Sequence, residues 1–287
     1  MVEHILGNYL IDTGKITKEQ FDNVMELQDT TRVKLGVLAV SEGLMTTEQA
    51  DEVNLLQIAE DRRFGDIAIE EGYLTAEQVE KLLKNQGSAY LAFIQNLMDE
   101  DYVTSEELDW LLDDFKKVNH YSNSDFENIK SDDVEKILPY LLPQEAMTYC
   151  PLVATVVRAM IRLVDRHVYL GRAAMDRSLP TADLALQRMT GVNGIVDCLA
   201  ERNGALLKTC CIYGQEMFSK LDEVALDAAG ELLNCANGMY VSELSNQGRF
   251  LDLMPPEYAS IEGVSDICRI PVFIGNVGLY LMVGKLK

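Results

Sequence analysis

The first 115 residues repeat one pattern four times. The copies begin at Leu6, Leu35, Phe64 and Phe93, so they follow one another at a constant interval of 29 residues and align without a gap. The fourth copy is the most divergent of the series. A repeat of this length is one supersecondary unit, which buries its apolar face only by packing on its neighbours. Residues 1–115 are therefore predicted to form an all-α domain of four helical hairpins.

Each repeat contains signals for two helices. The first helix is short and is expected to end at a left-handed residue, which is Gly14, Gly43 or Gly72, with Asp101 in the equivalent place of the fourth repeat. The second helix begins with a capping box, in which a Thr hydroxyl and a Gln or Glu side chain bond free backbone amides. The four boxes are Thr17 with Gln20, Thr46 with Gln49, Thr75 with Gln78, and Thr104 with Glu107.

The junctions between the repeats carry a further pattern. Gln28 precedes Lys34-Leu35-Gly36 by five intervening residues, and Gln57 precedes Arg63-Phe64-Gly65 by the same number. This spacing resembles the tandem motif of MshEN domains, which stand at the N-termini of type II secretion and pilus ATPases. The resemblance implies a cyclic di-GMP ligand and a secretion or pilus protein as a partner. The nucleotide-binding residues that it implies are Lys34, Leu35, Gly36, Gln57, Arg63, Gly65 and Gln86.

Two features favour a purely structural role for the repeats. The basic residue of the motif is replaced by Ile5 in the first repeat and by Ala92 in the fourth, and Lys34 lacks the planar guanidinium that stacks well on guanine. Residues 1–150 hold 31 acidic and 12 basic side chains, a net charge of −19, which offers no long-range attraction to a dianionic ligand. A helical scaffold and a nucleotide-binding domain both stay open as interpretations.

The charge of the whole chain limits its partners. A formal net charge of −21 repels a phosphate backbone and an anionic bilayer, so we expect neither nucleic-acid binding nor membrane insertion. The N-terminal residues lack the basic flank and apolar run of a signal peptide, which predicts a cytoplasmic protein. All six cysteines lie at or beyond position 150 without C-x-x-C spacing, which predicts buried, reduced thiols and no metal site.

The pattern changes after the repeats. Residues 116–144 are predicted to be a polar linker with one short helix, because Asn, Ser and Asp cluster there. Residues 145–287 are predicted to form an α+β domain, with long helices on one face of an antiparallel sheet. Its expected elements are a helix from Tyr149, a β-hairpin of residues 192–200 and 205–213 joined at Asn203-Gly204, a helix over residues 221–244, and a closing hairpin of residues 267–274 and 277–283.

The helix predicted over residues 221–244 carries the main candidate site. Asp227, Glu231, Asn234 and Gly238 are spaced by four, three and four residues, so they lie along one stripe of the helix. The expected inward-facing band is Val224, Ala228, Leu232, Ala236 and Met239. A carboxylate and a carboxamide offered side by side from a rigid helix are suited to insertion into a cleft of another protein.

This half of the chain resembles the CheC, CheX and FliY phosphatase family of bacterial chemotaxis, and most resembles CheX. The family signature is Asp or Ser, three residues, Glu, two residues, Asn, and then Pro after about 22 residues; Asp227, Glu231, Asn234 and Pro256 fit it, with 21 residues before the proline. The resemblance implies the α+β fold described above and a homodimer. It also implies dephosphorylation of the aspartyl phosphate of a CheY-like receiver domain.

The resemblance assigns roles to the residues of the stripe. Asn234 would position the attacking water through its amide, and Glu231 would bind and orient the receiver. Asp227, Gly238 and Pro256 would contact the partner. No cofactor bound by this chain is expected, because the receiver supplies the Mg²⁺. The alternative is a non-catalytic adaptor, which docks a receiver or dimerises while the repeats bind cyclic di-GMP or a protein of a secretion, pilus or motility system.

Overall fold

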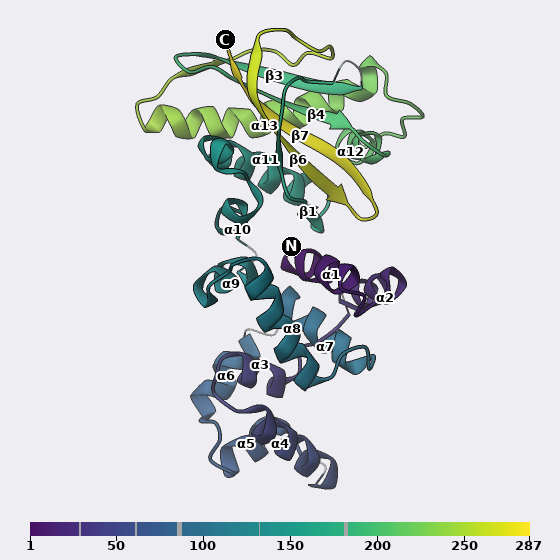
Figure 1. Cartoon of the computed structure of the whole chain (residues 1–287), viewed down its shortest axis with the longest axis vertical. Coiled ribbons are helices and arrows are strands. Elements are labelled where there is room, and N and C mark those ends of the chain that lie inside the picture. The colour runs from purple at the N-terminus through teal and green to yellow at the C-terminus, as the bar shows by residue number, and fades with distance from the viewer. Residues whose placement is uncertain (29, 61, 85–87, 132, 181–182) are drawn as a thin grey trace. The chain divides into compact units, whose positions relative to one another are not determined.

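The structure, a computed structural model, describes the 287 residues except 29, 61, 85–87, 132 and 181–182. The chain divides into two compact units, residues 2–126 and residues 127–287 (Figure 1). The first unit is helical, and the second combines helices with an antiparallel sheet. The boundary between the units falls within the predicted linker, residues 116–144.

Each repeat of the first unit contributes two helices, as predicted. The pairs are α1 (Val2–Asp12) with α2 (Lys18–Gln28), α3 (Leu35–Ser41) with α4 (Thr47–Glu60), α5 (Phe64–Glu70) with α6 (Ala76–Lys84), and α7 (Ala89–Asp99) with α8 (Ser105–Val118). The first helix of each pair ends at a left-handed residue, with φ of 69° at Gly14, 66° at Gly43, 76° at Gly72 and 58° at Asp101. All four capping boxes form as well.

The repeats pack in two pairs within this unit. The second and third repeats share one core, in which α4 packs on α5 and α3 packs on α6. The first and fourth repeats meet where α2 packs on α7. A Cβ on Gly36 would lie 3.0 Å from the Phe64 ring, and a Cβ on Gly65 would lie 3.0 Å from the Val79 side chain. Glycine is therefore needed at both positions for close packing of the helices.

The segment that links the repeats to the sheet is more helical than its polar composition indicates. It forms α9 (Asn123–Lys130), α10 (Val134–Leu141) and the 3-10 turn η1 (Gln144–Tyr149). The Asp125 carboxylate accepts from the Ser122 backbone N–H at 2.7 Å and so caps the start of α9, while Phe126 and Ile129 are buried. The predicted polar linker with one short helix, residues 116–144, therefore differs from the structure, which has α9 and α10 there.

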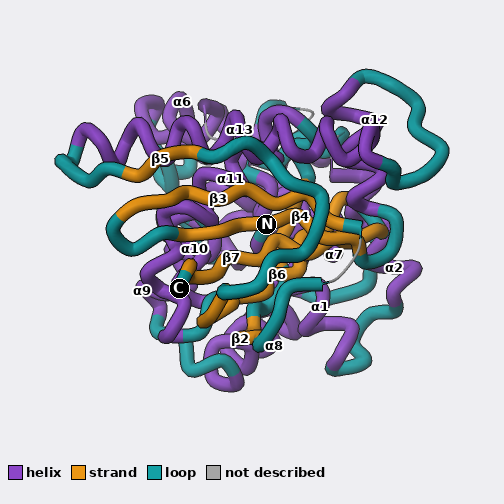
Figure 2. The backbone as a smooth tube through the Cα atoms, turned by 90° about the horizontal axis from the view of Figure 1, so that it is seen from above, coloured by secondary structure: helices purple, strands orange, loops and turns teal. Residues whose placement is uncertain are grey.

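The second unit is built on an antiparallel sheet with the order β1-β6-β7-β4-β3-β5, with β2 paired to β6. Figure 2 shows β3, β4, β7 and β6 side by side, with α13 running alongside. The strands are β1 (Val168–Leu170), β2 (Ala174–Asp176), β3 (Leu184–Gly191), β4 (Ile195–Glu201), β5 (Leu251–Leu253), β6 (Val264–Ile274) and β7 (Val277–Leu286). The closing hairpin β6–β7 was predicted from the sequence.

Three helices pack around the core of this unit. They are α11 (Cys150–Leu163), α12 (Ala205–Gly214) and α13 (Glu223–Asn246). Helix α13 packs on α11, on α12 and on strand β3, so one side of it is buried along most of its length. Its buried residues include Leu226, Leu232, Leu233, Ala236 and Tyr240. The expected inward band was therefore wrong at its ends, because Val224 is 66% exposed and Met239 is 39% exposed.

The hairpin predicted over residues 192–213 is wrong in its second half. Residues 205–214 form helix α12, and the neighbours of β4 are β3 and β7. The turn that the sequence suggested needs φ > 0 at two successive residues, but only Gly204 of the pair Asn203-Gly204 has a positive φ, of 92°. The Glu201 carboxylate instead accepts from the backbone N–H of Leu206 at 3.2 Å and stabilises the start of the helix.

Candidate functional site

The predicted stripe of α13 faces solvent. Asp227 and Glu231 are exposed, and Asn234 and Gly238 are partly exposed. The helix begins with Asp222, whose carboxylate accepts from the Ala225 backbone N–H at 3.2 Å. The stripe thus lies on the outer side of a helix whose other side is anchored in the core.

Glu231 and Asn234 lie next to each other on this stripe. Asn234 Nδ2 is 3.5 Å from Glu231 Oε2, and Asn234 Oδ1 accepts a hydrogen bond of 2.8 Å from Gln187 Nε2 of strand β3. The amide therefore has its oxygen toward the sheet and its nitrogen toward the carboxylate. This leaves one N–H and one lone pair of the carboxamide for a water molecule or a ligand.

Asp227 is held by a residue that follows the helix. The Tyr258 hydroxyl donates to Asp227 Oδ1 at 2.6 Å. Burial and this hydrogen bond both raise the pKa of Tyr258 above its ordinary value. Asp227, which was predicted to bind a partner, therefore also fastens the segment after β5 to the helix.

The space beside α13 differs between its two glycine positions, Gly230 and Gly238. A Cβ on Gly230 would lie 2.8 Å from Pro256 Cβ, so this glycine lets the proline pack directly on the helix. A Cβ on Gly238 would have no described atom within 4 Å. Gly238 is therefore not required by the packing of the described residues, although glycine within a helix costs about 1 kcal/mol relative to alanine.

Beneath Asn234 lies a chain of buried polar side chains. Gln187, Asn237 and Asp197 are each 0% exposed. Asn237 Nδ2 donates to Gln187 Oε1 at 3.0 Å and to Asp197 Oδ1 at 2.8 Å. The remaining N–H of Gln187 donates to the backbone carbonyl of Met254 at 2.8 Å. Burial raises the pKa of Asp197 to about 7, although its hydrogen bond from Asn237 acts in the opposite direction.

The sequence did not predict this buried hydrogen-bond chain or the contact of Tyr258 with Asp227. The members of the chain come from β3, β4 and α13, and only the sheet register brings Gln187 opposite Asp197. The available signal was a polar residue in the middle of an apolar strand run, at Gln187 and at Asp197. Such residues are buried only when they are hydrogen-bonded.

The surface around Asn234 is open. A shallow hollow of about 670 Å³ follows α13, and it is lined by Asn234, Cys235, Gly238, Met239, Ser242, Glu243 and Asn246. All of these residues come from one helix, so the hollow has no opposing wall among them. A surface of this shape is suited to another protein better than to an enclosed small molecule.

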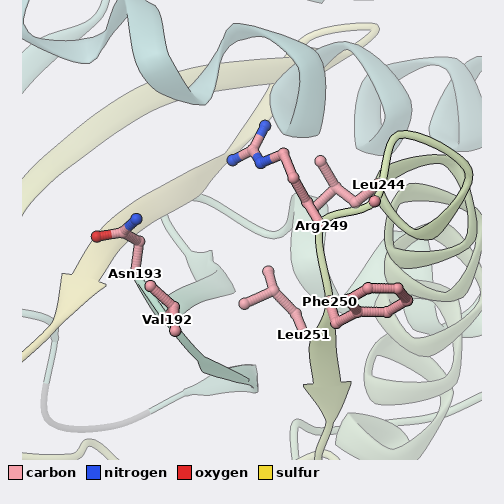
Figure 3. Close-up of a pocket in the computed structure, with 7 residues that line it drawn as sticks. Val192, Asn193, Leu244, Arg249, Phe250 and Leu251 are labelled. Atoms are coloured by element: carbon pink, nitrogen blue, oxygen red, sulfur yellow. The ribbon is translucent and has the colours of Figure 1, made fainter.

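A separate pocket lies toward the C-terminal end of α13. Figure 3 shows Val192 and Asn193 on one side of it and Leu244 and Phe250 on the other. Its volume is about 350 Å³. No described residue lines both this pocket and the hollow around Asn234, so the two are distinct.

The residues implied as a nucleotide site in the repeats have mainly structural partners. Lys34 donates from its backbone N–H to Gln95 Oε1 at 2.6 Å and pairs through Nζ with Asp99 at 2.6 Å. Leu35 packs beside Gly65, whose Cβ would lie 3.3 Å from Leu35 Cδ2. Gln57 and Arg63 are exposed, and Gln86 lies outside the described residues. The cyclic di-GMP site stays a prediction.

Two other predicted properties concern membranes and metals. Within the described residues, one helical stretch, Gln144–Leu163, is long and apolar enough to cross a membrane, but 56% of it is buried inside the fold, as in a core helix. The described residues contain no group of three or more His, Cys, Asp or Glu side chains placed to hold a metal ion. The six cysteines are free thiols, of which Cys235 is exposed, contrary to the prediction that they are buried.

No protein-family model matches the chain. No curated protein matches it either. The chain is similar over about half of its length to several solved structures, among them one CheC-like protein and two CheX proteins. A CheC-like superfamily protein from Shewanella sp. PV-4 is 16% identical, with a TM-score of 0.41, and the match covers 50% of this chain and 99% of that protein.

The other two structures are CheX proteins. CheX from Vibrio vulnificus is 17% identical, with a TM-score of 0.40, over 47% of this chain and 96% of that protein. CheX from Borrelia burgdorferi, solved in complex with CheY, BeF₃ and Mg²⁺, is 12% identical, with a TM-score of 0.40, over 48% of this chain and 96% of that protein. The resemblance of the repeats to MshEN domains gains no support from these comparisons and stays a prediction.

Proposed function

We propose that the second unit dephosphorylates the aspartyl phosphate of a CheY-like receiver domain. The observation that carries the proposal is the pair Glu231 and Asn234, which lies on the solvent side of α13 with the Asn234 amide held from behind by Gln187. An exposed and oriented amide can enter the site of another protein and hold a water molecule there. The match of Asp227, Glu231, Asn234 and Pro256 to the phosphatase signature supports the same function.

In the proposed reaction, Asn234 holds a water molecule in line with the acyl phosphate. The water oxygen attacks phosphorus while the bond from phosphorus to the aspartate oxygen breaks, which releases inorganic phosphate and the free carboxylate. One water proton passes to solvent. Mg²⁺ carried by the receiver supplies charge neutralisation on the phosphoryl group. Glu231 pairs with a cationic group of the receiver and sets its orientation, and neither residue has to change its protonation state.

The exposed acidic groups define the chemistry of the partner surface. Asp227 and Glu231 lie one turn apart on the exposed side of α13, and Glu243 lies farther along it. A receiver that presents basic side chains around its phosphorylation site is complementary to this surface. A homodimer and a secretion or pilus partner stay predictions.

The proposal is tested with the full-length protein and a panel of receivers labelled with radioactive phosphate on their aspartate. We expect at least one receiver to lose its label about 100-fold or more faster in the presence of the protein. The Asn234→Ala variant is the control and should lose this effect. Binding of a receiver without faster loss of label would instead identify a non-catalytic adaptor.

Replacement of Gly238 separates partner contact from folding. Gly238→Ala should raise the free energy of unfolding by about 0.5 to 1 kcal/mol, because alanine favours helix and its Cβ would meet no described atom within 4 Å; Gly238→Leu shares the helix preference. The leucine side chain should weaken receiver binding about tenfold or more by blocking close approach, whereas alanine should change it little. Receiver affinity and thermal unfolding measure the two effects.

Gly230→Ala is the matched comparison for this pair. The same added methyl group would meet Pro256 at 2.8 Å, so this variant should lose stability although Gly238→Ala gains it. If Gly238→Leu binds the receiver as well as the wild type does, the surface around Gly238 is not the docking surface.

A further inference from the structure

Each side-chain amide in the hydrogen-bond chain beneath Asn234 has a defined orientation, with its donor and acceptor ends on fixed sides. The backbone carbonyl of Met254 can only accept, so Gln187 has to turn Nε2 toward it and Oε1 toward Asn237, whose Nδ2 also donates to Asp197 Oδ1. The second N–H of Gln187 Nε2 donates to Asn234 Oδ1. Each amide is thus oriented by its hydrogen-bond partners.

Gln187, the last member of this hydrogen-bond chain, determines the orientation of the Asn234 amide. If Asn234 were turned over, its Nδ2 would face Gln187 Nε2, and two donors would meet. With Oδ1 toward Gln187, the nitrogen faces Glu231 at 3.5 Å. Gln187 therefore distinguishes the two ends of the Asn234 amide, which are otherwise nearly equal in size. A water molecule held by this amide then has its donor and acceptor partners on defined sides.

Two buried oxygens at the base of the chain have no partner among the described residues, and they belong to the same pair of side chains. They are Asp197 Oδ2 and Asn237 Oδ1. A proton on Asp197 Oδ2 would donate to Asn237 Oδ1, while Asn237 Nδ2 already donates to Asp197 Oδ1. A carboxylic acid and an amide joined in this way satisfy both unmet oxygens at once. An unpaired buried carboxylate would be costly in the same place.

The surroundings of Asp197 agree with a neutral acid. Its cross-strand neighbours are Gln187 on β3 and Val283 on β7, and Asn237 meets it from α13. None of these three side chains titrates. The nearest titratable group along the chain is the buried thiol of Cys198, whose pKa is raised by burial and which therefore stays neutral. The described neighbours thus bring no cation to the Asp197 carboxyl.

We propose that Gln187 is a positioning residue, which orients the Asn234 amide for the attacking water and is itself oriented by the Met254 carbonyl and by Asn237, which pairs with protonated Asp197. Gln187 does not touch the substrate in this arrangement, because it lies wholly within the core. The inference rests on the proposed phosphatase function for its catalytic part only. The buried hydrogen-bond chain and the proton on Asp197 are properties of the free protein.

The catalytic part is tested by replacing Gln187. Gln187→Leu removes the donor to Asn234, and Gln187→Glu puts an acceptor in its place, which favours the overturned amide. Both variants should bind a receiver that carries the phosphoryl mimic fluoroberyllate within about threefold of wild type, but lower the rate of phosphate loss at saturation about 10- to 100-fold. A residue with only a structural role would lower thermal stability and leave the saturated rate unchanged, which would overturn the proposal.

The structural part is tested without a receiver. In carbon-13 NMR spectra of the full-length protein, the Asp197 carboxyl should have the chemical shift of a neutral acid at pH 6, and the side-chain amide signals of Gln187 should move in Asn234→Ala. A carboxylate chemical shift for Asp197 at pH 6, or unchanged Gln187 amide signals in Asn234→Ala, would contradict the proposed hydrogen-bond chain even if the protein is a phosphatase.

Failure of the phosphatase function and failure of the positioning role of Gln187 would give different results in these experiments. If the free protein has the expected NMR signals but no receiver loses phosphate faster, then the phosphatase function fails and the hydrogen-bond chain stands. If wild type dephosphorylates a receiver and the Gln187 variants do so equally fast at saturation, then the function stands and the positioning role of Gln187 is rejected. Thermal unfolding of each variant establishes that the compared proteins are folded.

Discussion

Asn234→Ala is expected to lower the rate of phosphate loss from a bound receiver by about 100-fold or more. The amide is the group that would hold the water, and misplacement of a reacting group by about 1 Å can already cost that factor. The free energy of unfolding should change by only about 1 kcal/mol, because Asn234 is partly exposed and water can replace its bond to Gln187. The measurement is the rate constant of phosphate loss at saturating protein.

Two further variants make this result specific. Asn234→Asp keeps an oxygen toward Gln187 but puts a second carboxylate oxygen where Nδ2 is 3.5 Å from Glu231. This variant should be as slow as alanine, because it loses the donor and adds repulsion. Ser245→Ala changes an exposed residue about three turns farther along the same helix, outside the hollow around Asn234, and should keep the wild-type rate. If Ser245→Ala were equally slow, the effect of Asn234→Ala would not be specific to the amide.

The second large effect concerns the stability of the second unit as a function of pH. The pKa of Asp197 is raised from 3.8 to about 7 in the folded protein. Between these values the folded state binds a proton that the unfolded state has released, so the free energy of unfolding should fall as the pH rises from about 4 to about 7. A shift of this size corresponds to about 4 kcal/mol. Above the folded pKa, this contribution should be fully lost.

Asp197→Asn isolates this contribution from those of the other carboxyl groups. The variant should match wild type near pH 3, where the acid is protonated in both the folded and the unfolded state, and should be more stable by about 4 kcal/mol at pH 8. Hydrogen exchange of the β4 backbone amides measures the stability of this unit, whereas the single tryptophan, Trp110, lies in the repeats. An equal difference between variant and wild type at both pH values would contradict the assignment.

The helical repeats were predictable because their signals are local. Gly14, Gly43 and Gly72 adopt the left-handed conformation that their positions required, and the Thr residues cap the second helices. Each of these features depends on residues no more than four positions apart. The pairing of the second repeat with the third depends on the same periodicity, since glycines at fixed places allow the helices to approach.

The sheet was predicted less well because its pairing is not local. Strand β3 follows a segment with a left-handed Asp183 and was not expected, whereas the β-like composition of residues 205–213 was outweighed by the helix start at Gly204. The side chains of Ala205, Leu206, Thr209 and Cys210 are buried with a helical spacing, which the β-branched neighbours obscured. Composition alone did not separate these alternatives.

The candidate site was predictable in its exposed half and hidden in its buried half. Glu231 and Asn234 share a helix face, so their spacing alone places them together. Gln187 and Asp197 reach Asn234 and Asn237 only through the register of β3 and β4 against α13. A sequence pattern has no access to a hydrogen-bond chain whose members are 47 and 40 positions apart.

The lifetime of the aspartyl phosphate on one bound receiver tests the central claim most directly. The receiver is charged with radioactive phosphate and mixed with increasing concentrations of the full-length protein, and the first-order loss of label is followed. The account predicts a rate that rises to a plateau about 100-fold or more above the receiver alone and stays at the starting value with Asn234→Ala. A receiver that binds the α13 surface and keeps its full phosphoryl lifetime would contradict it.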